Sequence, residues 1–242
     1  MASDIPGLLE TLRERFVASK AHGRFVAAVT GSVAVGKSTF AEELRAAMSG
    51  WREKPRVAVA PTDGFLYSNA VLAERGLSYR KGFPESYDVG LLRRTVSEIK
   101  RGEESHIPLY SHVTYDVDPS NTLLVRDSDI VLLDGLHLGR IKAGDAGQLI
   151  DALVYLDAEE ADIESWFRAR LIPLMQAGRT DPNSFYHSFR TLDDAGISAF
   201  TDRVWREINL PNLRNHIVHD RAAADFVVRK RRDHSVERVE SR

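Results

Sequence analysis

Short apolar runs alternate along the chain with longer segments in which apolar residues recur every three or four positions. The apolar runs are uniform and too short for helices, so they predict buried strands. Strands packed in this way between helices predict a mostly parallel sheet covered on both faces. The predicted strands are residues 25–29, 57–60, 130–133, 153–156 and 226–228, and the predicted helices are residues 5–19, 39–48, 88–100, 159–176 and 193–209.

A glycine-rich loop joins the first predicted strand to the helix that follows, with the spacing G-x-x-x-x-G-K-[ST]. Gly31 and Gly36 allow the backbone to approach a phosphate closely, and the N–H groups at the start of the helix point at the anion. Lys37 would reach the β- and γ-phosphates, and the Ser38 hydroxyl would bind Mg²⁺. The sequence therefore predicts a nucleotide site made of Gly31, Ser32, Val33, Ala34, Val35, Gly36, Lys37, Ser38 and Thr39.

Two carboxylates lie just past the ends of predicted strands. Asp63 comes after residues 57–60, and Asp134 comes after residues 130–133. Ligands of parallel sheets bind beyond the carboxyl ends of the strands, so both should lie near the glycine loop at one edge. Asp134 is expected to hold Mg²⁺. For Asp63, the residues alone leave two interpretations open: a base that takes a proton from an acceptor hydroxyl, or an ordinary turn residue.

Three further groups of residues are ambiguous on pattern alone. Arg168, Arg170 and Arg179 near the end of a long predicted helix could stabilise a transferring phosphoryl group, although their spacing favours a solvated helix face. Residues 110–115 gather rings and hydroxyls in what reads as a proline-flanked loop, either a substrate wall or packing. The basic run at residues 229–234 suits a solvated chain end.

Composition narrows the class of protein. The chain has 242 residues and no cysteine, so disulfides and thiolate metal sites are excluded. A net charge of −2 argues against a general nucleic-acid binder. No stretch approaches the 18 or so apolar residues of a membrane span, and the start lacks a secretory pattern. We expect one cytoplasmic domain over residues 1–242, with an N-terminal helix within residues 1–22 and a charged C-terminal segment at 229–242.

Several blocks from about Phe25 onward resemble the bacterial type I pantothenate kinases, which are close to the uridine kinase and phosphoribulokinase-like kinases. The resemblance implies a P-loop NTPase three-layer fold, a homodimer, and the use of ATP and Mg²⁺ to convert pantothenate to 4′-phosphopantothenate, the first step of coenzyme A biosynthesis. Residues 81–88 are the most specific block, because general NTPases lack it. The matching blocks are residues 31–39, Thr62-Asp63-Gly64-Phe65-Leu66, Lys81-Gly82-Phe83-Pro84-Glu85-Ser86-Tyr87-Asp88, Tyr110-Ser111-His112 with Tyr115-Asp116, Thr180-Asp181-Pro182 and Glu207-Ile208-Asn209.

The resemblance also implies roles for individual residues. Asp63 matches the family's catalytic base, and Lys37 and Arg170 match residues that neutralise the transferring phosphoryl group. Lys230 and His234 match tail residues near the adenine of ATP. The expected substrate contacts are Asp63, Tyr110, His112, Tyr115, Arg170 and Asn212.

Departures from the family pattern keep other functions open. Leu171 and Leu174 stand where the family has aromatic residues, so a kinase of the same fold acting on a nucleoside, a sugar or glycerate is the nearest alternative. Asp134 stands for a usual Glu and His137 for a usual Asn. A GTPase-like switch would need an N-K-x-D segment after a late strand, and residues 215–218 do not fit it.

Overall fold

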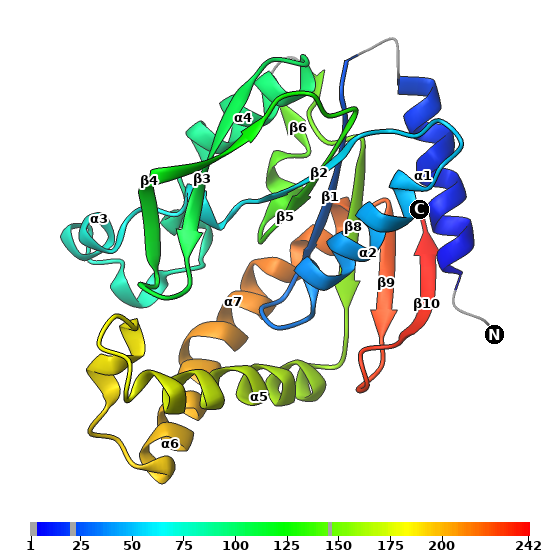
Figure 1. Ribbon diagram of the computed structural model, residues 1–242. Helices are drawn as coiled ribbons and strands as arrows, with labels where there is room; N and C mark the ends of the chain where they lie inside the picture. The colour runs from blue at the N-terminus through cyan, green and yellow to red at the C-terminus, as the bar shows by residue number, and fades with distance from the viewer. Residues whose placement is uncertain (1–3, 20–22, 145–146) are drawn as a thin grey trace.

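A computed structural model describes residues 4–19, 23–144 and 147–242. Its centre is a six-stranded sheet in the order β10-β9-β8-β1-β5-β2. Neighbouring strands are parallel, except that β10 runs antiparallel to β9 (Figure 1). The strands are β1 (Phe25–Gly31), β2 (Val57–Pro61), β5 (Ile130–Asp134), β8 (Ala152–Asp157), β9 (Phe226–Lys230) and β10 (Val236–Ser241).

Helices flank this sheet, so the predicted α/β class is confirmed. Helix α2 packs on β1, β2 and β5 with α1 next to it, and α4 also contacts β1. The carboxyl ends of the parallel strands point toward the bottom of Figure 1, where α5 and α6 lie. The main helices are α1 (Ile5–Ser19), α2 (Lys37–Ser49), α4 (Val89–Lys100), α5 (Glu160–Gly178), α6 (Asp194–Val204) and α7 (Leu210–Asn215), and α3 (Asn69–Glu74) and α8 (Asp220–Ala223) are short.

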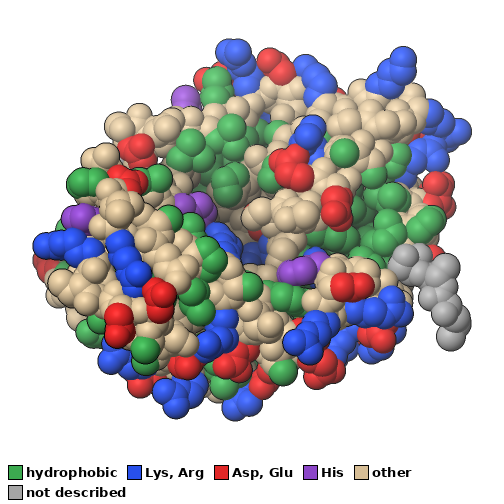
Figure 2. All heavy atoms as spheres, turned by 60° about the horizontal axis from the view of Figure 1, so that its bottom comes forward, with side chains coloured by type: hydrophobic (Ala, Val, Ile, Leu, Met, Phe, Trp, Pro, Cys, Tyr) green, Lys and Arg blue, Asp and Glu red, His purple; other side chains and the backbone are tan. Residues whose placement is uncertain are grey.

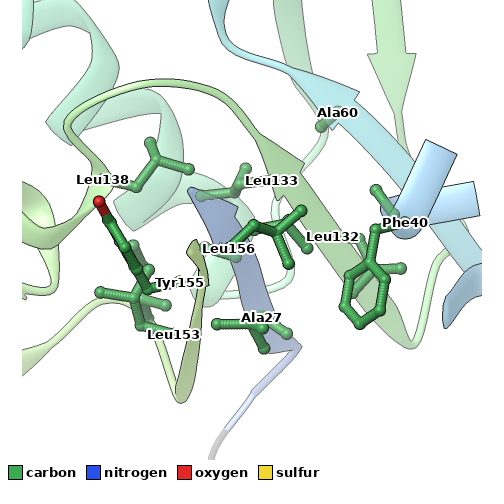
Figure 3. Close-up of a cluster of buried hydrophobic side chains, with 14 of the residues drawn as sticks. Ala27, Phe40, Ala60, Leu132, Leu133, Leu138, Leu153, Tyr155 and Leu156 are labelled. Atoms are coloured by element: carbon green, nitrogen blue, oxygen red, sulfur yellow. The ribbon is translucent and has the colours of Figure 1, made fainter. Parts of the chain in front are cut away.

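The apolar core fixes the central strands. Every residue of β1 and β5 is buried, as expected for strands covered on both faces. On α2, Phe40, Leu44 and Met48 follow one another at four-residue steps and are all buried. Figure 3 shows Phe40 among the aliphatic side chains of the sheet, including Leu132. The strand ends that carry the candidate residues are therefore held by a continuous core.

The predicted helix over residues 193–209 forms, but it includes a π-helical turn and continues beyond residue 209. Helix α6 ends at Val204, a π-helical turn follows (η7, Trp205–Asn209), and α7 then begins. Pro211 lies in the first turn of α7 and has no N–H to donate to the carbonyl four residues earlier. The wider π turn accommodates this missing bond.

The expected loop at residues 110–115 is instead the end of a β-hairpin. Tyr110 and Ser111 close β3 (Ser105–Ser111), and β4 (Asp116–Val125) begins after a turn at residues 112–115. Proline suggested a loop, but Pro108 lies where the register between the two strands shifts. A proline is tolerated at such an irregularity because no regular ladder bond is required there.

The C-terminal segment differs from its prediction, whereas the N-terminal helix agrees with it. The predicted solvated end at residues 229–234 is correct only for the exposed turn at residues 231–235, because residues 229–230 belong to β9 and the chain continues as β10. Strand β10 pairs with β9, and its Val236 and Val239 pack on the core. The two valines are three residues apart, and a register shift between Val236 and Arg238 allows both to pack on the core, which the charge count concealed. Helix α1 confirms the N-terminal helix, and residues 1–3 and 20–22 of the predicted range lie outside the described residues.

Arg24 stabilises the end of the molecule opposite the candidate site. It is 8% exposed, and its guanidinium donates to the carbonyls of five residues: Ile99, Gly102, Glu103, Arg126 and Ser128. Arg24→Met keeps the aliphatic length but removes all five of these hydrogen bonds. We expect the free energy of unfolding to fall by about 2–4 kcal/mol.

Denaturant unfolding measures this loss, with Arg45→Met as the control. Arg45 is a surface residue whose ion pair with Glu42 is exposed, and its loss should cost less than about 0.5 kcal/mol. Equal stability of the two variants would show that the carbonyl contacts of Arg24 contribute little.

Candidate functional site

The glycine loop adopts the conformation that its sequence predicts. Gly31 and Gly36 have positive φ values of 146° and 89°. Gly36 directly precedes α2 and has no side chain with which to cap that helix end. The first amides of a 13-residue helix are thus left to a ligand, in a loop whose backbone can come close to it.

The residues predicted to gather at this edge do so. Lys37 begins α2 and its Nζ donates to the Ser32 carbonyl at 2.9 Å. Burial lowers the pKa of Lys37, whereas the neighbouring carboxylates of Asp134 and Asp63 act to raise it. One ammonium therefore lies within electrostatic reach of both candidate carboxylates, beside the amides of the loop.

Ser38 and Asp134 form an oxygen-only pair. The Ser38 hydroxyl donates to Asp134 Oδ2 at 2.5 Å, and Asp134 is 7% exposed. Its Oδ1 is buried and has no hydrogen-bond partner among the described residues. Burial raises the pKa of Asp134, and Lys37 opposes that rise. A hydroxyl and a carboxylate with a spare oxygen fit Mg²⁺, which binds through one or two carboxylates and the phosphates of a nucleotide.

Asp63 lies next to this pair. It begins a single 3₁₀ turn (η2, Asp63–Phe65) that is separated from β2 by Thr62 alone, and it is half-buried. The turn is irregular backbone at the edge of a rigid sheet, which is where ligand-binding side chains are commonly placed. At this position the Asp63 carboxylate could contact a second substrate bound next to the glycine loop.

Aromatic side chains form a wall on the hairpin side of Asp63. The Tyr110 ring contacts the rings of His112 at 5.3 Å and Tyr115 at 5.9 Å. Tyr115 stacks on Phe185 of the segment after α5, with ring centroids 4.7 Å apart. The structure thus brings three predicted substrate contacts together and links them to a distant part of the chain.

Asn212 is linked to this aromatic wall through the backbone of Gly82. It is 4% exposed, and its Nδ2 donates to the Gly82 carbonyl at 2.7 Å. His137 Nε2 donates to the same carbonyl at 2.9 Å. Gly82 belongs to the specific block at residues 81–88. The side chains of Asn212 and His137 therefore hold this block next to the aromatic wall.

Lys81 is a site residue to which the sequence assigned no role. Its Nζ donates to Asn69 Oδ1 at 2.6 Å and to the Tyr115 carbonyl at 2.5 Å, and it lies over the rings of Tyr110 and Tyr115. Burial lowers its pKa to about 8, against the opposing carboxylates of Asp116 and Asp63. The only signal was a lysine inside the specific block at residues 81–88.

The three arginines separate into two kinds. Arg168 pairs with Asp202 and Ser198, and Arg179 pairs with Asp194, so both hold α5 to its neighbours. The Arg170 side chain makes no hydrogen bond or ion pair within the described ranges. Its charge instead acts on Lys37, Asp134 and Tyr115, which places it on the candidate site. Arg170 is itself exposed, so its role at the site stays a prediction.

Two residues near the chain end lie beside the glycine loop. Lys230 is 7% exposed, and its Nζ donates to the Val35 carbonyl at 3.2 Å. The His234 ring stacks on Trp166 of α5 at 4.0 Å. A side chain at Gly36 would come within 2.9 Å of Lys230 Nζ and 4.0 Å of His234 Nδ1. Figure 2 shows this end of the molecule hollowed at its centre, with basic and histidine side chains bordering the hollow.

The two leucines that replace family aromatics differ in environment. Leu171 is 8% exposed and belongs to the apolar core, whereas Leu174, one turn further along α5, is 44% exposed. Leu171 therefore shapes the interior behind the site, and Leu174 faces outward.

Comparisons with known proteins agree with this geometry. The model of the phosphoribulokinase / uridine kinase family matches residues 26–170. A pantothenate kinase of Sorangium cellulosum is 43% identical over 90% of this chain and 72% of its own length. A pantothenate kinase of Mycolicibacterium smegmatis is 44% identical, over 90% of this chain and 70% of its own length.

Solved structures share the fold at lower identity. The putative fructose transport system kinase of Silicibacter has a TM-score of 0.63 and 23% identity, covering 90% of this chain and 95% of its own. D-glycerate 3-kinase of Cryptococcus neoformans has a TM-score of 0.64 and 11% identity, with both chains fully covered. At these identities the likeness concerns the fold alone.

Proposed function

The chain belongs to the phosphoribulokinase and uridine kinase family and to the pantothenate kinases, and from this we infer that it is an ATP-dependent kinase that phosphorylates pantothenate. The relatives' shared name over 90% of the chain is the observation that carries the inference. The gathering of Lys37, Asp63, Asp134 and Arg170 beside the glycine loop supports it, because phosphoryl transfer needs charge neutralisation and a positioned acceptor.

In this proposal Asp63 orients the primary hydroxyl of pantothenate and accepts its proton as the hydroxyl oxygen bonds to the γ-phosphorus. Lys37 and Arg170 stabilise the negative charge that spreads over the transferring group. ADP leaves with the bridging oxygen, and 4′-phosphopantothenate remains. Tyr110, His112, Tyr115 and Asn212 hold the rest of the acceptor, away from the reacting atoms.

The nucleotide lies along the glycine loop, with its phosphates on the amides of residues 31–39. Ser38 and Asp134 would hold Mg²⁺, which would neutralise part of the phosphate charge. Lys230 and His234 border the loop on the outer side, where the adenine would lie. The backbone and tail residues thus bind the nucleotide, and the two carboxylates face its terminal phosphate.

We also propose the domain organisation, the cellular compartment and the oligomeric state of the enzyme. Residues 1–242 act as one kinase domain, in the cytoplasm and as a homodimer, on the family resemblance and the absence of cysteine. None of the helices in the described ranges is long and apolar enough to cross a bilayer. Sedimentation of the purified protein measures the oligomeric state directly.

An acceptor panel tests the function. Wild-type protein with MgATP is given pantothenate, uridine, D-glycerate, D-fructose or no acceptor, and ADP release is followed. Pantothenate should exceed every other acceptor in kcat/KM by at least about a hundredfold, because the polar wall is matched to one set of donors and acceptors. A higher value with another acceptor would assign this site to that acceptor instead.

Lys81 gives the proposed reaction a pH limit. Its ammonium lies in the acceptor wall near Asp63, and burial lowers its pKa to about 8. A lowered pKa means that the charge is present below pH 8 and lost above it. We therefore expect kcat/KM to fall as the pH rises through about 8. In Lys81→Arg the fall should move to higher pH, because a guanidinium stays charged. An unchanged wild-type profile up to pH 9.5 would show that the charge of Lys81 is not required.

A further inference from the structure

A buried tyrosine contacts the carboxylate that we assign as the base. The Tyr87 hydroxyl lies 3.4 Å from Asp63 Oδ1 and donates to it. Tyr87 is 6% exposed. In the described part of the chain, this is the one hydrogen bond made to the Asp63 carboxylate. The side chain that would accept the substrate proton therefore has a single fixed neighbour.

The backbone around Tyr87 is fastened to the segment that carries Asp63. The Tyr67 amide donates to the Ser86 carbonyl at 2.8 Å, and the Asp88 amide donates to the Phe65 carbonyl at 2.8 Å. Leu66 and Tyr87 form an isolated antiparallel bridge between these two bonds. The relative position of the phenol and the carboxylate is thus set by main-chain hydrogen bonds on both sides of Tyr87.

The ring of Tyr87 is held on its other side as well. It contacts the His137 ring at 6.0 Å in an edge-on arrangement. His137 is itself 6% exposed and bonded to the Gly82 carbonyl. A ring packed between these elements has little freedom to move, so its hydroxyl stays directed at Asp63.

The Tyr87 hydroxyl bonds to only one of the two oxygens of the Asp63 carboxylate. A carboxylate has two oxygens, and a donor fixed on Oδ1 leaves Oδ2 for the acceptor hydroxyl. Burial raises the pKa of Tyr87 well above its ordinary value, and the charge of Asp63 adds to the rise. The phenol therefore remains a neutral donor throughout the working pH range. Its bond also limits rotation of a side chain that stands on one irregular turn.

We propose that Tyr87 is a positioning residue that orients the Asp63 carboxylate toward the acceptor hydroxyl. This inference rests on the proposed function, since it assumes that Asp63 is the base. Tyr87 does not touch the reacting atoms in this scheme and acts only through Asp63. Its removal should thus affect the chemical step more than the binding of either substrate.

Tyr87→Phe removes the hydroxyl and keeps the ring. We expect kcat for pantothenate phosphorylation to fall about tenfold, while KM for ATP and for pantothenate changes less than twofold. Tyr155→Phe is the matched control, because Tyr155 is also a buried tyrosine, at 2% exposed, but lies in the core strand β8. That control should keep its kcat within twofold.

A double-mutant cycle separates positioning from a general effect on the fold. If Tyr87 acts through Asp63, adding Tyr87→Phe to Asp63→Asn should lower the residual rate less than twofold. A further tenfold fall in that background, or an unchanged kcat in Tyr87→Phe alone, would overturn the proposal.

The same experiment separates this inference from the proposed function. If wild-type protein does not phosphorylate pantothenate, the proposed function fails. If Asp63→Asn retains its turnover, the assignment of the base fails. If both hold and Tyr87→Phe retains its turnover, the positioning role alone fails.

Discussion

Asp63→Asn should lower kcat at least a hundredfold and leave ATP affinity nearly unchanged. The amide is close in shape to the carboxylate but cannot accept a proton, and general-base catalysis contributes roughly 10²–10⁴ in rate. Among the described residues the Asp63 carboxylate makes no hydrogen bond to the glycine loop, so the loop amides stay available to the nucleotide. Initial rates at saturating substrates and an ATP titration by calorimetry measure the two quantities.

Asp127→Asn is the control for this change. Asp127 is 72% exposed and makes only surface ion pairs with arginines, so its replacement should keep kcat within twofold. If Asp63→Asn turned over at the wild-type rate, Asp63 would be the turn residue of the alternative interpretation.

Lys37→Met should lower kcat by about 10²–10³ and weaken ATP binding as well. Removing one preorganised charge that stabilises a transferring group lowers kcat by about this factor. In the proposed function Lys37, unlike Asp63, would also contact the nucleotide before transfer, so both kcat and affinity should change. Rates and ATP titrations on the purified variant measure them, with melting temperatures to confirm that the loop contact to Ser32 is not required for folding.

Lys54→Met is the matched lysine control, because Lys54 is exposed and lies on the connection before β2. It should retain wild-type rates and affinity. Full ATP affinity in Lys37→Met would remove Lys37 from the nucleotide site.

The local signals in the sequence were sufficient for the nucleotide side of the site. Uniform apolar runs located β1 and β5, and the glycine spacing located the loop between β1 and α2. The rule that ligands meet the carboxyl ends of parallel strands then correctly placed Asp63 and Asp134 at one edge of the sheet. These inferences depend only on neighbours within a few residues and on strand direction.

The acceptor side depends on contacts between distant segments, and there the sequence was less informative. Lys81 acquires its position from Asn69 and from the Tyr115 carbonyl, 34 residues away. Tyr87 reaches Asp63 only because two backbone bonds fasten its segment to the turn after β2. Neither lysine nor tyrosine has a local pattern that reveals such a partner.

The sequence also failed to predict three strands in which the local composition argues against a strand. Proline within residues 105–125 and charge within residues 229–242 each argued against strands, yet β3, β4 and β10 form. In both places an irregular pairing or a few apolar residues outweighed the local composition. Residue roles taken from the resemblance remain proposals that the variants above test.

Phosphorus NMR of one reaction tests the central claim most directly. Wild-type protein is mixed with MgATP and pantothenate, and the ³¹P spectrum is followed until ATP is consumed. The account predicts that the γ-phosphate signal is replaced by a phosphomonoester signal split by two neighbouring protons, as for a phosphorylated primary alcohol. Conversion of ATP to ADP and inorganic phosphate alone, or no consumption of ATP, would contradict it.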